Sequence, residues 1–228
     1  PAPDLPNSIP QKGQEMNTVS PTPLMLITGG SRGVGAATAR LAAARGYDVV
    51  ITFVSNEAAA HAVTADVEAA GRRALAVRAD SADPEQITQL FSVIDREFGR
   101  IDVLVNNAGI IAQQSRLENL GFERMQRIFA VNAIGPMLCA QQAVRRMSTR
   151  HNGRGGVVIN ISSASARLGS PNEYVDYAAS KGALETFTTG LSKEVAREGI
   201  RVCCAIVWLA SDEASFITGT FLDVTGGK

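Results

Sequence analysis

Two side chains late in the sequence are suited to proton transfer. Tyr177 and Lys181 stand four residues apart in the stretch YVDYAASKGAL, and on a helix such residues share one face, one turn from each other. A phenol is a weak base at neutral pH, but an ammonium about 4 Å away at an effective dielectric of about 20 favours the phenolate by roughly 4 kcal/mol. The pair is therefore a candidate general acid and base. Tyr174 is a competing phenol, but the residue four positions beyond it is Ala178, so it lacks such a partner.

The second feature that could do chemistry is the glycine-rich sequence TGGSRGVG, residues 28–35. Gly29, Gly33 and Gly35 follow a short apolar run and precede a helical pattern, where backbone N–H groups and the positive end of the helix can approach a pyrophosphate. The spacing G-x-x-x-G-x-G differs from the more familiar G-x-G-x-x-G, and no Gly-Lys-Ser/Thr follows, which excludes a P-loop. We interpret the segment as a dinucleotide-binding turn; the alternative is a turn that serves the fold alone.

Residues after the next apolar run bear on which dinucleotide is bound. Ser55 and Asn56 occupy the place where an acidic side chain would bind the 2′-hydroxyl of NAD, and Glu57 comes one step later, inside the expected helix. Arg32, within the glycine-rich turn, can pair with a 2′-phosphate, unless it is simply a solvated loop residue. The sequence favours NADP over NAD, which stays possible.

The elements that must position these residues alternate regularly from Leu24 onward. Short apolar runs at 24–28, 48–53, 74–79, 101–107, 155–162 and 200–204 predict strands, and the patterns at 34–45, 57–70, 84–98 and about 173–197 predict helices. Several runs are apolar on both alternating faces, which is typical of parallel strands covered on both sides. The alternation predicts an α/β fold in a single domain, a Rossmann-type doubly wound parallel sheet with helices on both faces.

Residues typical of helix starts and helix ends support these boundaries. Asp83-Pro84 is a cap followed by proline at the first helical position, and glycines stand where helices should end, at Gly46, Gly71, Gly99 and Gly199. Residues 1–23 carry most of the nine prolines and few apolar side chains, a composition that predicts a disordered tail. Met16 is a candidate natural start, with the preceding residues added for expression.

Composition narrows the functional classes. The net charge is zero, which gives no reason to expect nucleic acid or an acidic membrane as a partner. Three cysteines and two histidines provide neither a disulfide framework nor a metal site, so we expect inert thiols, no metal and a cytoplasmic location. The sequence contains neither a long apolar run nor the pattern of a signal peptide.

Six motifs in order resemble the short-chain dehydrogenase/reductase family. They are TGGSRGVG, NNAG at 106–109, Asn132 in VNAIG, Ser163 after VINIS, YAASK at 177–181, and the terminal ITGTFLDVTGG. Together they cover nearly everything from Leu24 to Lys228. The stretch SPNEYVDYAASKGAL further resembles NADP-type members described as glucose-dehydrogenase-like.

The resemblance implies an NAD(P)-dependent oxidoreductase that interconverts a carbonyl and a secondary alcohol by hydride transfer. Tyr177 would be the general acid and base, Lys181 would favour the phenolate and hold the nicotinamide ribose, Ser163 would bind the substrate oxygen, and Asn132 would anchor a water leading to Lys181. The cofactor-binding set implied is Gly29, Ser31, Arg32, Gly33, Val34, Ser55, Asn56, Asp80, Ser81, Asn107, Ala108, Gly109, Tyr177 and Lys181. Relatives usually assemble as tetramers, so we expect a homotetramer, or a homodimer.

Some assignments have structural alternatives. Ser163 precedes Tyr177 by one residue more than is usual in the family, and Ala164 stands at the usual position. An extra residue in the loop RLGSPNEYVD accounts for this, with Ser162 and Ser165 as weaker candidates for the role of Ser163. Asn132 could instead cap or kink its helix, and Asn107 could serve to join adjacent strands.

One departure from the family falls at the stretch GIRVCCAIVWLAS, where a strand meets a helix without a turn. Relatives place a Pro-Gly turn and a mobile substrate lid here. We expect domain 24–228 to carry an omitted or deleted lid segment between Cys204 and Ala205. If the lid is truly deleted, the chain would be a catalytically silent dinucleotide-binding or scaffold protein. If it is only omitted, the chain is an active enzyme on a small-molecule carbonyl or alcohol, which the four catalytic residues favour.

Overall fold

Six short strands form one parallel sheet in the order β3-β2-β1-β4-β5-β6. The strands are β1 (Leu24–Ile27), β2 (Asp48–Phe53), β3 (Ala74–Arg78), β4 (Val103–Asn106), β5 (Gly156–Asn160) and β6 (Ile200–Cys203). The structure is a computed structural model that describes residues 22–203. Residues 1–21 of the expected tail and the join between Cys204 and Ala205 lie outside the described residues.

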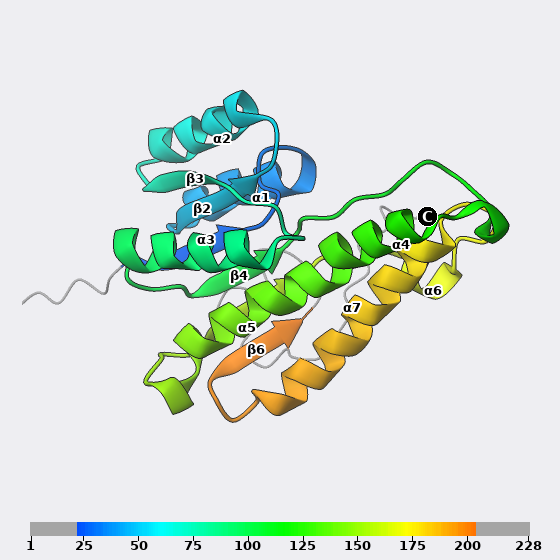
Figure 1. Cartoon of the computed structure of the whole chain (residues 1–228). Helices are drawn as coiled ribbons and strands as arrows, with labels where there is room; N and C mark the ends of the chain where they lie inside the picture. The colour runs from blue at the N-terminus through cyan, green and yellow to red at the C-terminus, as the bar shows by residue number, and fades with distance from the viewer. Residues whose placement is uncertain (1–21, 204–228) are drawn as a thin grey trace, which may run out of the picture.

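Helices lie on both faces of this sheet, as the sequence predicted. They are α1 (Gly33–Ala44), α2 (Glu57–Ala69), α3 (Pro84–Glu97), α4 (Phe122–Phe129), α5 (Gly135–Met147), α6 (Ser165–Leu168) and α7 (Val175–Glu194). In Figure 1, α3, α5 and α7 lie side by side across one face, and α1 lies behind the sheet. The long loop after β4 leads to the short 3-10 helix η1 (Leu117–Asn119) and then to α4.

Each face of the sheet has its own apolar core. One core packs alanines of α1, such as Ala39, against Met25 and Ile51, and the other packs Leu90 and Phe91 of α3 against Leu26. Every residue of β1, β2 and β4 is buried, which confirms that the central strands are covered on both sides. Successive side chains of a strand point to opposite faces of the sheet, so one apolar run contributes residues to both cores.

Helix ends follow the expected chemistry. The Asp83 carboxylate accepts hydrogen bonds from the N–H groups of Glu85 and Gln86, with Pro84 at the first helical position. The four glycines predicted to end helices all have positive φ, between 68° and 90°. The helix expected at about 173–197 is shorter and spans Val175–Glu194, because the residue before it, Tyr174, has non-helical backbone (φ −142°, ψ 47°).

A π-helical segment, η2 (Ala130–Ile134), joins α4 to α5 without a break in helical backbone. Such single-turn bulges are frequent at functional sites because they rotate side chains out of the helical register. This one contains Asn132. A further 3-10 turn, η3 (Thr149–His151), leads from α5 toward β5.

Candidate functional site

The sheet reverses its strand order between β1 and β4, and the glycine-rich turn follows β1 at this point. In open α/β sheets such a switch point is where ligands bind, beyond the carboxyl ends of the strands. Arg32 is the N-cap of α1 and makes no side-chain hydrogen bond to the helix. Among the described residues, no heavy atom lies within 4 Å of where a Cβ on Gly33 would stand. The helix N-terminus is therefore open to a ligand phosphate.

Two glycines are required by the geometry of this turn. Gly29 has φ +66°, and a Cβ there would lie 3.0 Å from the Cα of Ala108. A Cβ on Gly35 would lie 2.6 Å from both the Gly29 carbonyl oxygen and Asn107 Nδ2. The missing side chains let the loops after β1 and β4 pack directly on each other.

Asn107 holds these two loops together. Its Nδ2 donates to the carbonyl oxygens of Thr28 and Gly29, at 2.8 and 3.0 Å. The Thr28 hydroxyl in turn accepts hydrogen bonds from the N–H groups of Asn107 and Ala108. The strand-joining alternative for Asn107 is therefore present in the structure. Thr28 was missed in the sequence, although a threonine at the first position of the turn was visible there.

The end of β2 is followed by exposed polar residues. Ser55 and Asn56 are exposed, and α2 begins at Glu57, as expected. Asn56 Oδ1 accepts the N–H of Ala59 and caps α2. Asn56 thus already has a structural role, while Arg32 is exposed on the neighbouring turn.

Asp80 and Ser81 follow β3. Arg127 of α4 donates to Asp80 Oδ2 at 2.7 Å, and the Ala82 N–H donates to Oδ1. Burial raises the pKa of the Asp80 carboxyl, but the hydrogen bonds from Arg127 and Ala82 outweigh it and the pKa is lowered overall. Ser81 is buried. The Asp80 carboxylate is thus held in its anionic form just beyond the carboxyl end of β3.

Tyr177 and Lys181 lie on one face of α7, as their spacing predicted. Lys181 Nζ lies 5.9 Å from the centroid of the Tyr177 ring. The ammonium is buried and donates to the Ile161 carbonyl oxygen, just beyond β5, at 2.7 Å. Tyr177 itself is half-buried, so its phenol can meet a ligand. The backbone of Ile161 is a partner that side-chain patterns could not reveal.

Asn132 is fully buried in η2. Its Oδ1 accepts the N–H of Ile110 at 2.8 Å, and its Nδ2 donates to the Ile110 carbonyl oxygen and to Ser180 Oγ. A Cβ on Gly109 would lie 3.5 Å from Asn132 Oδ1 and 3.6 Å from Lys181 Nζ. The loop after β4, the π-helical segment and α7 therefore meet at one point beside Gly109.

Ser163 stands at the strand end expected for it, beyond β5 and half-buried. Its Oγ accepts the Ser165 N–H at 3.2 Å, which leaves its own O–H able to donate. Ser162 instead donates to Glu185 at 2.7 Å, and Ser165 begins α6. Of the three serines, Ser163 has the hydroxyl best placed to donate to a ligand.

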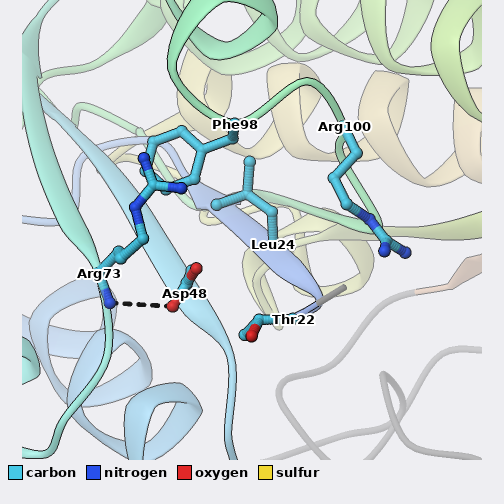
Figure 2. A pocket seen from close by; sticks show the side chains of 6 residues that line it. All are labelled: Thr22, Leu24, Asp48, Arg73, Phe98 and Arg100. Carbon is cyan, nitrogen blue, oxygen red and sulfur yellow. Dashed lines mark hydrogen bonds between the residues drawn. The ribbon is translucent and has the colours of Figure 1, made fainter. Parts of the chain in front are cut away.

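Two cavities of the described chain lie at the opposite, amino-terminal end of the strands. Figure 2 shows the smaller one, about 200 Å³, where the Arg73 guanidinium stacks on Phe98 and the Arg73 N–H donates to Asp48. The larger, about 390 Å³, is lined by residues that include Arg145 and Arg154. Neither contains any residue of the predicted site. Within residues 22–203 there is no group of His, Cys, Asp and Glu side chains able to hold a metal, and no helix long and apolar enough to cross a membrane.

Comparison with known proteins agrees with this fold. The profile of the short chain dehydrogenase family matches residues 23–208. The chain is 42% identical to the uncharacterized oxidoreductase YgfF of Escherichia coli, over 90% of this chain and 99% of the relative.

Two solved structures have similar folds. A blue fluorescent protein from a metagenomic library, in complex with NADPH, superposes with a TM-score of 0.83 at 31% identity, over 90% of this chain and 97% of the other. A short chain dehydrogenase from Burkholderia cenocepacia, in complex with NADP, gives 0.79 at 33% identity, over 87% and 94%.

The fold is that of a Rossmann-type, doubly wound α/β protein. The chain belongs to the short-chain dehydrogenase/reductase family of oxidoreductases.

Proposed function

We propose that this protein is an NADP-dependent oxidoreductase that interconverts a carbonyl and a secondary alcohol, with Tyr177 as general acid and base. The observation that carries the proposal is the meeting of Lys181 Nζ and Asn132 Oδ1 beside Gly109, with Tyr177 one turn away on α7. Burial of such polar groups is costly unless they are hydrogen-bonded, and Ile161 and Ile110 provide the hydrogen bonds that hold Lys181 and Asn132 there.

The residues that follow β1, β2 and β3 would hold the dinucleotide. The open N-terminus of α1 at Gly33 would take the pyrophosphate, and Asp80 and Ser81 would lie near the adenine. Arg32 and the absence of an acidic residue at Ser55 and Asn56 favour the 2′-phosphate of NADP, as does the fact that two similar structures hold NADPH or NADP. The remaining contacts would come from Gly29, Ser31, Val34, Asn107, Ala108, Gly109, Tyr177 and Lys181.

The chain's own residues would handle the proton. The nicotinamide, when bound, supplies or accepts the hydride at the substrate carbon. Tyr177 Oη donates a proton to the carbonyl oxygen in reduction and takes the hydroxyl proton in oxidation. Ser163 donates a hydrogen bond to the same oxygen and stabilises the charge that develops there. Lys181 holds the nicotinamide ribose, and Asn132 anchors a water through which a proton relay leads to Lys181.

Replacement of each of two tyrosines by phenylalanine tests the proposed reaction. NADPH oxidation is followed with a panel of aldehydes, ketones and polyols, sugars included because of the glucose-dehydrogenase-like stretch. Tyr177→Phe should lower kcat by about 100-fold or more, as loss of a general acid does. Tyr174→Phe removes a half-buried phenol three positions earlier and is the matched control. If Tyr177→Phe retains carbonyl reduction, the assignment of Tyr177 is wrong.

A missing substrate cover at the join of Cys204 and Ala205 is part of the proposal. The alignment with YgfF spans 245 positions but uses only 90% of this 228-residue chain, so a stretch of the relative has no counterpart here. An intact mass clearly above 24.0 kDa for the purified protein would show that the segment exists in the molecule. A mass of 24.0 kDa with NADPH binding and no turnover would favour a silent dinucleotide-binding protein instead.

We also propose a cytoplasmic homotetramer, or a homodimer. Leu117 of η1 and Phe122, the first residue of α4, are 66% and 68% exposed. Exposure of two large apolar side chains in neighbouring elements supports a subunit interface there. Light scattering on the purified protein measures the assembly, and a monomer would contradict the proposal.

A further inference from the structure

The proposed general acid, Tyr177, lies in the first turn of α7, where backbone N–H groups lack hydrogen-bond partners within the helix. Tyr177 is the third residue of α7, which begins at Val175. The first N–H groups of a helix have no partner within it. Tyr174, at the N-cap, offers no side-chain acceptor. A side chain must therefore supply the missing acceptor in this turn if the phenol is to keep one position.

Asp176 supplies the acceptor that the cap lacks. Its Oδ1 accepts the N–H of Tyr177 at 2.9 Å, and its side chain is only 2% exposed. Burial raises the pKa of this carboxyl, but hydrogen bonds from Arg124 and the Tyr177 N–H outweigh burial and the pKa is lowered overall. The buried carboxylate is therefore charged at neutral pH.

Arg124 of α4 holds Asp176 in place. Its Nε donates to Asp176 Oδ2 at 2.7 Å and its Nη2 to Oδ1 at 3.2 Å, while Nη1 donates to the Gln113 carbonyl oxygen at 2.5 Å. One guanidinium thus joins α4, the loop after β4 and the first turn of α7. A planar fork that binds both carboxylate oxygens fixes orientation as well as distance, which a lysine could not do equally well.

The same loop is also joined to the segment before α7 by further hydrogen bonds. The Ser115 N–H donates to the Glu173 carbonyl oxygen at 3.0 Å, and Arg116 Nη1 donates to Asn172 Oδ1 at 2.8 Å. Asn172 has φ +63°, a conformation that persists only where its surroundings hold it. The approach to Tyr177 is thus clamped to the loop that carries Gly109 and Ile110.

We propose that Arg124, acting through Asp176, is a positioning residue that sets the place of the Tyr177 phenol relative to the substrate oxygen. The inference rests on the proposed role of Tyr177. Arg124 and Asp176 are 52 residues apart in sequence, and the hydrogen bond from the Tyr177 N–H to Asp176 Oδ1 joins the pair to Tyr177. A rigid first turn matters because a misplacement of about 1 Å can lower a rate by about 100-fold.

Four variants separate positioning from stability. Arg124→Ala removes the fork, Arg124→Lys keeps the charge but not the fork, and Asp176→Asn keeps an oxygen for the Tyr177 N–H but not the charge. Arg146→Ala is the matched control, because Arg146 makes a similar two-point pair with Asp95, between α5 and α3 and outside the predicted site. Each variant is assayed with NADPH and 2,3-butanedione, or the ketone that the panel shows to be reduced fastest. The folded fraction is measured by circular dichroism.

Positioning predicts a loss in kcat, per folded molecule, of about 10- to 100-fold for Arg124→Ala, with a smaller loss for Arg124→Lys. The affinity for NADPH should stay within about twofold of the wild type, and the solvent deuterium isotope effect on kcat should rise, because proton transfer alone is slowed. A purely structural role would lower the folded fraction and leave both kcat per folded molecule and the isotope effect unchanged. If Arg124→Ala does not fold, Arg124→Lys and Asp176→Asn decide by the same readouts.

Tyr177→Phe distinguishes failure of this inference from failure of the proposed function. If Tyr177→Phe stays active, the role of Tyr177 fails and the positioning role with it. If Tyr177→Phe is inactive while the Arg124 and Asp176 variants match Arg146→Ala in kcat and isotope effect, the positioning role alone is overturned.

Discussion

Gly29 and Gly71 offer a matched test of the contact that closes the cofactor turn. Both have left-handed backbone, with φ +66° and +76°. A Cβ on Gly71 would meet no heavy atom of the described chain within 4 Å, whereas one on Gly29 would lie 3.0 Å from the Cα of Ala108. Alanine at either site therefore carries the conformational cost, and only Gly29→Ala adds a collision with backbone, which cannot rotate away.

The magnitudes follow from these two terms. A left-handed alanine costs about 1–2 kcal/mol, and overpacking adds about 1–3 kcal/mol. Gly71→Ala should lower the free energy of unfolding by about 1–2 kcal/mol and Gly29→Ala by about 2–5 kcal/mol. Because relief of the collision must move the loops of Gly29 and Ala108 apart, Gly29→Ala should also weaken NADPH binding, and Gly71→Ala should not.

Urea unfolding followed by circular dichroism gives the stabilities, and NADPH fluorescence titration gives the affinities. Equal losses of stability in the two variants would refute the inferred collision at Ala108. An unchanged NADPH affinity in Gly29→Ala would refute the inference that this turn binds the cofactor.

Three further predictions concern buried polar groups. Asn132→Ala should lower the unfolding free energy by about 2–4 kcal/mol, because it leaves the partly buried N–H and carbonyl of Ile110 without their partners. Ser180→Ala removes the acceptor of the Asn132 Nδ2 hydrogen bond and a local bond to the Tyr177 carbonyl oxygen, and should cost about 1 kcal/mol; comparable losses in the two variants would contradict this account. The pKa of the Asp176 carboxyl lies below the ordinary value of 3.8, so the stability that the carboxylate contributes is complete above pH 3.8 and is lost as the pH falls through the folded-state pKa. The difference in unfolding free energy between wild type and Asp176→Asn, measured by urea titration, should therefore shrink on acidification. A difference that does not change with pH would contradict this account. Burial raises the pKa of the Cys139 thiol to about 12, so iodoacetamide at mildly alkaline pH should alkylate Cys139 only after unfolding, as peptide mass mapping would show, and rapid native labelling would disprove its burial.

Much of the site was set by local sequence. The spacing of Tyr177 and Lys181 determines that they share a helix face, and the pattern of glycines between β1 and α1 determines a turn open to phosphate. The doubly wound parallel sheet followed from runs that are apolar on both faces. These features depend on backbone geometry over a few residues, which the sequence encodes directly.

The long stretch between β4 and β5 was not predictable in the same way. Its π-helical segment at Asn132 interrupts ordinary helical periodicity, and the backbone groups of Ile110 that require it come from another segment. The late start of α7 depends on the non-helical backbone of Tyr174, a residue type that does not mark a helix start in the sequence.

The sequence by itself determined the chemistry that is available: a phenol one helical turn from an ammonium, a strand-end hydroxyl and a glycine-rich turn between the first strand and helix. Only the tertiary structure decided how those groups are held. Ile161 offers Lys181 a backbone oxygen, and Arg124 reaches Asp176 from a helix far along the chain. Backbone acceptors leave no mark in residue types, and an ion pair between distant helices exists only once packing has brought them together.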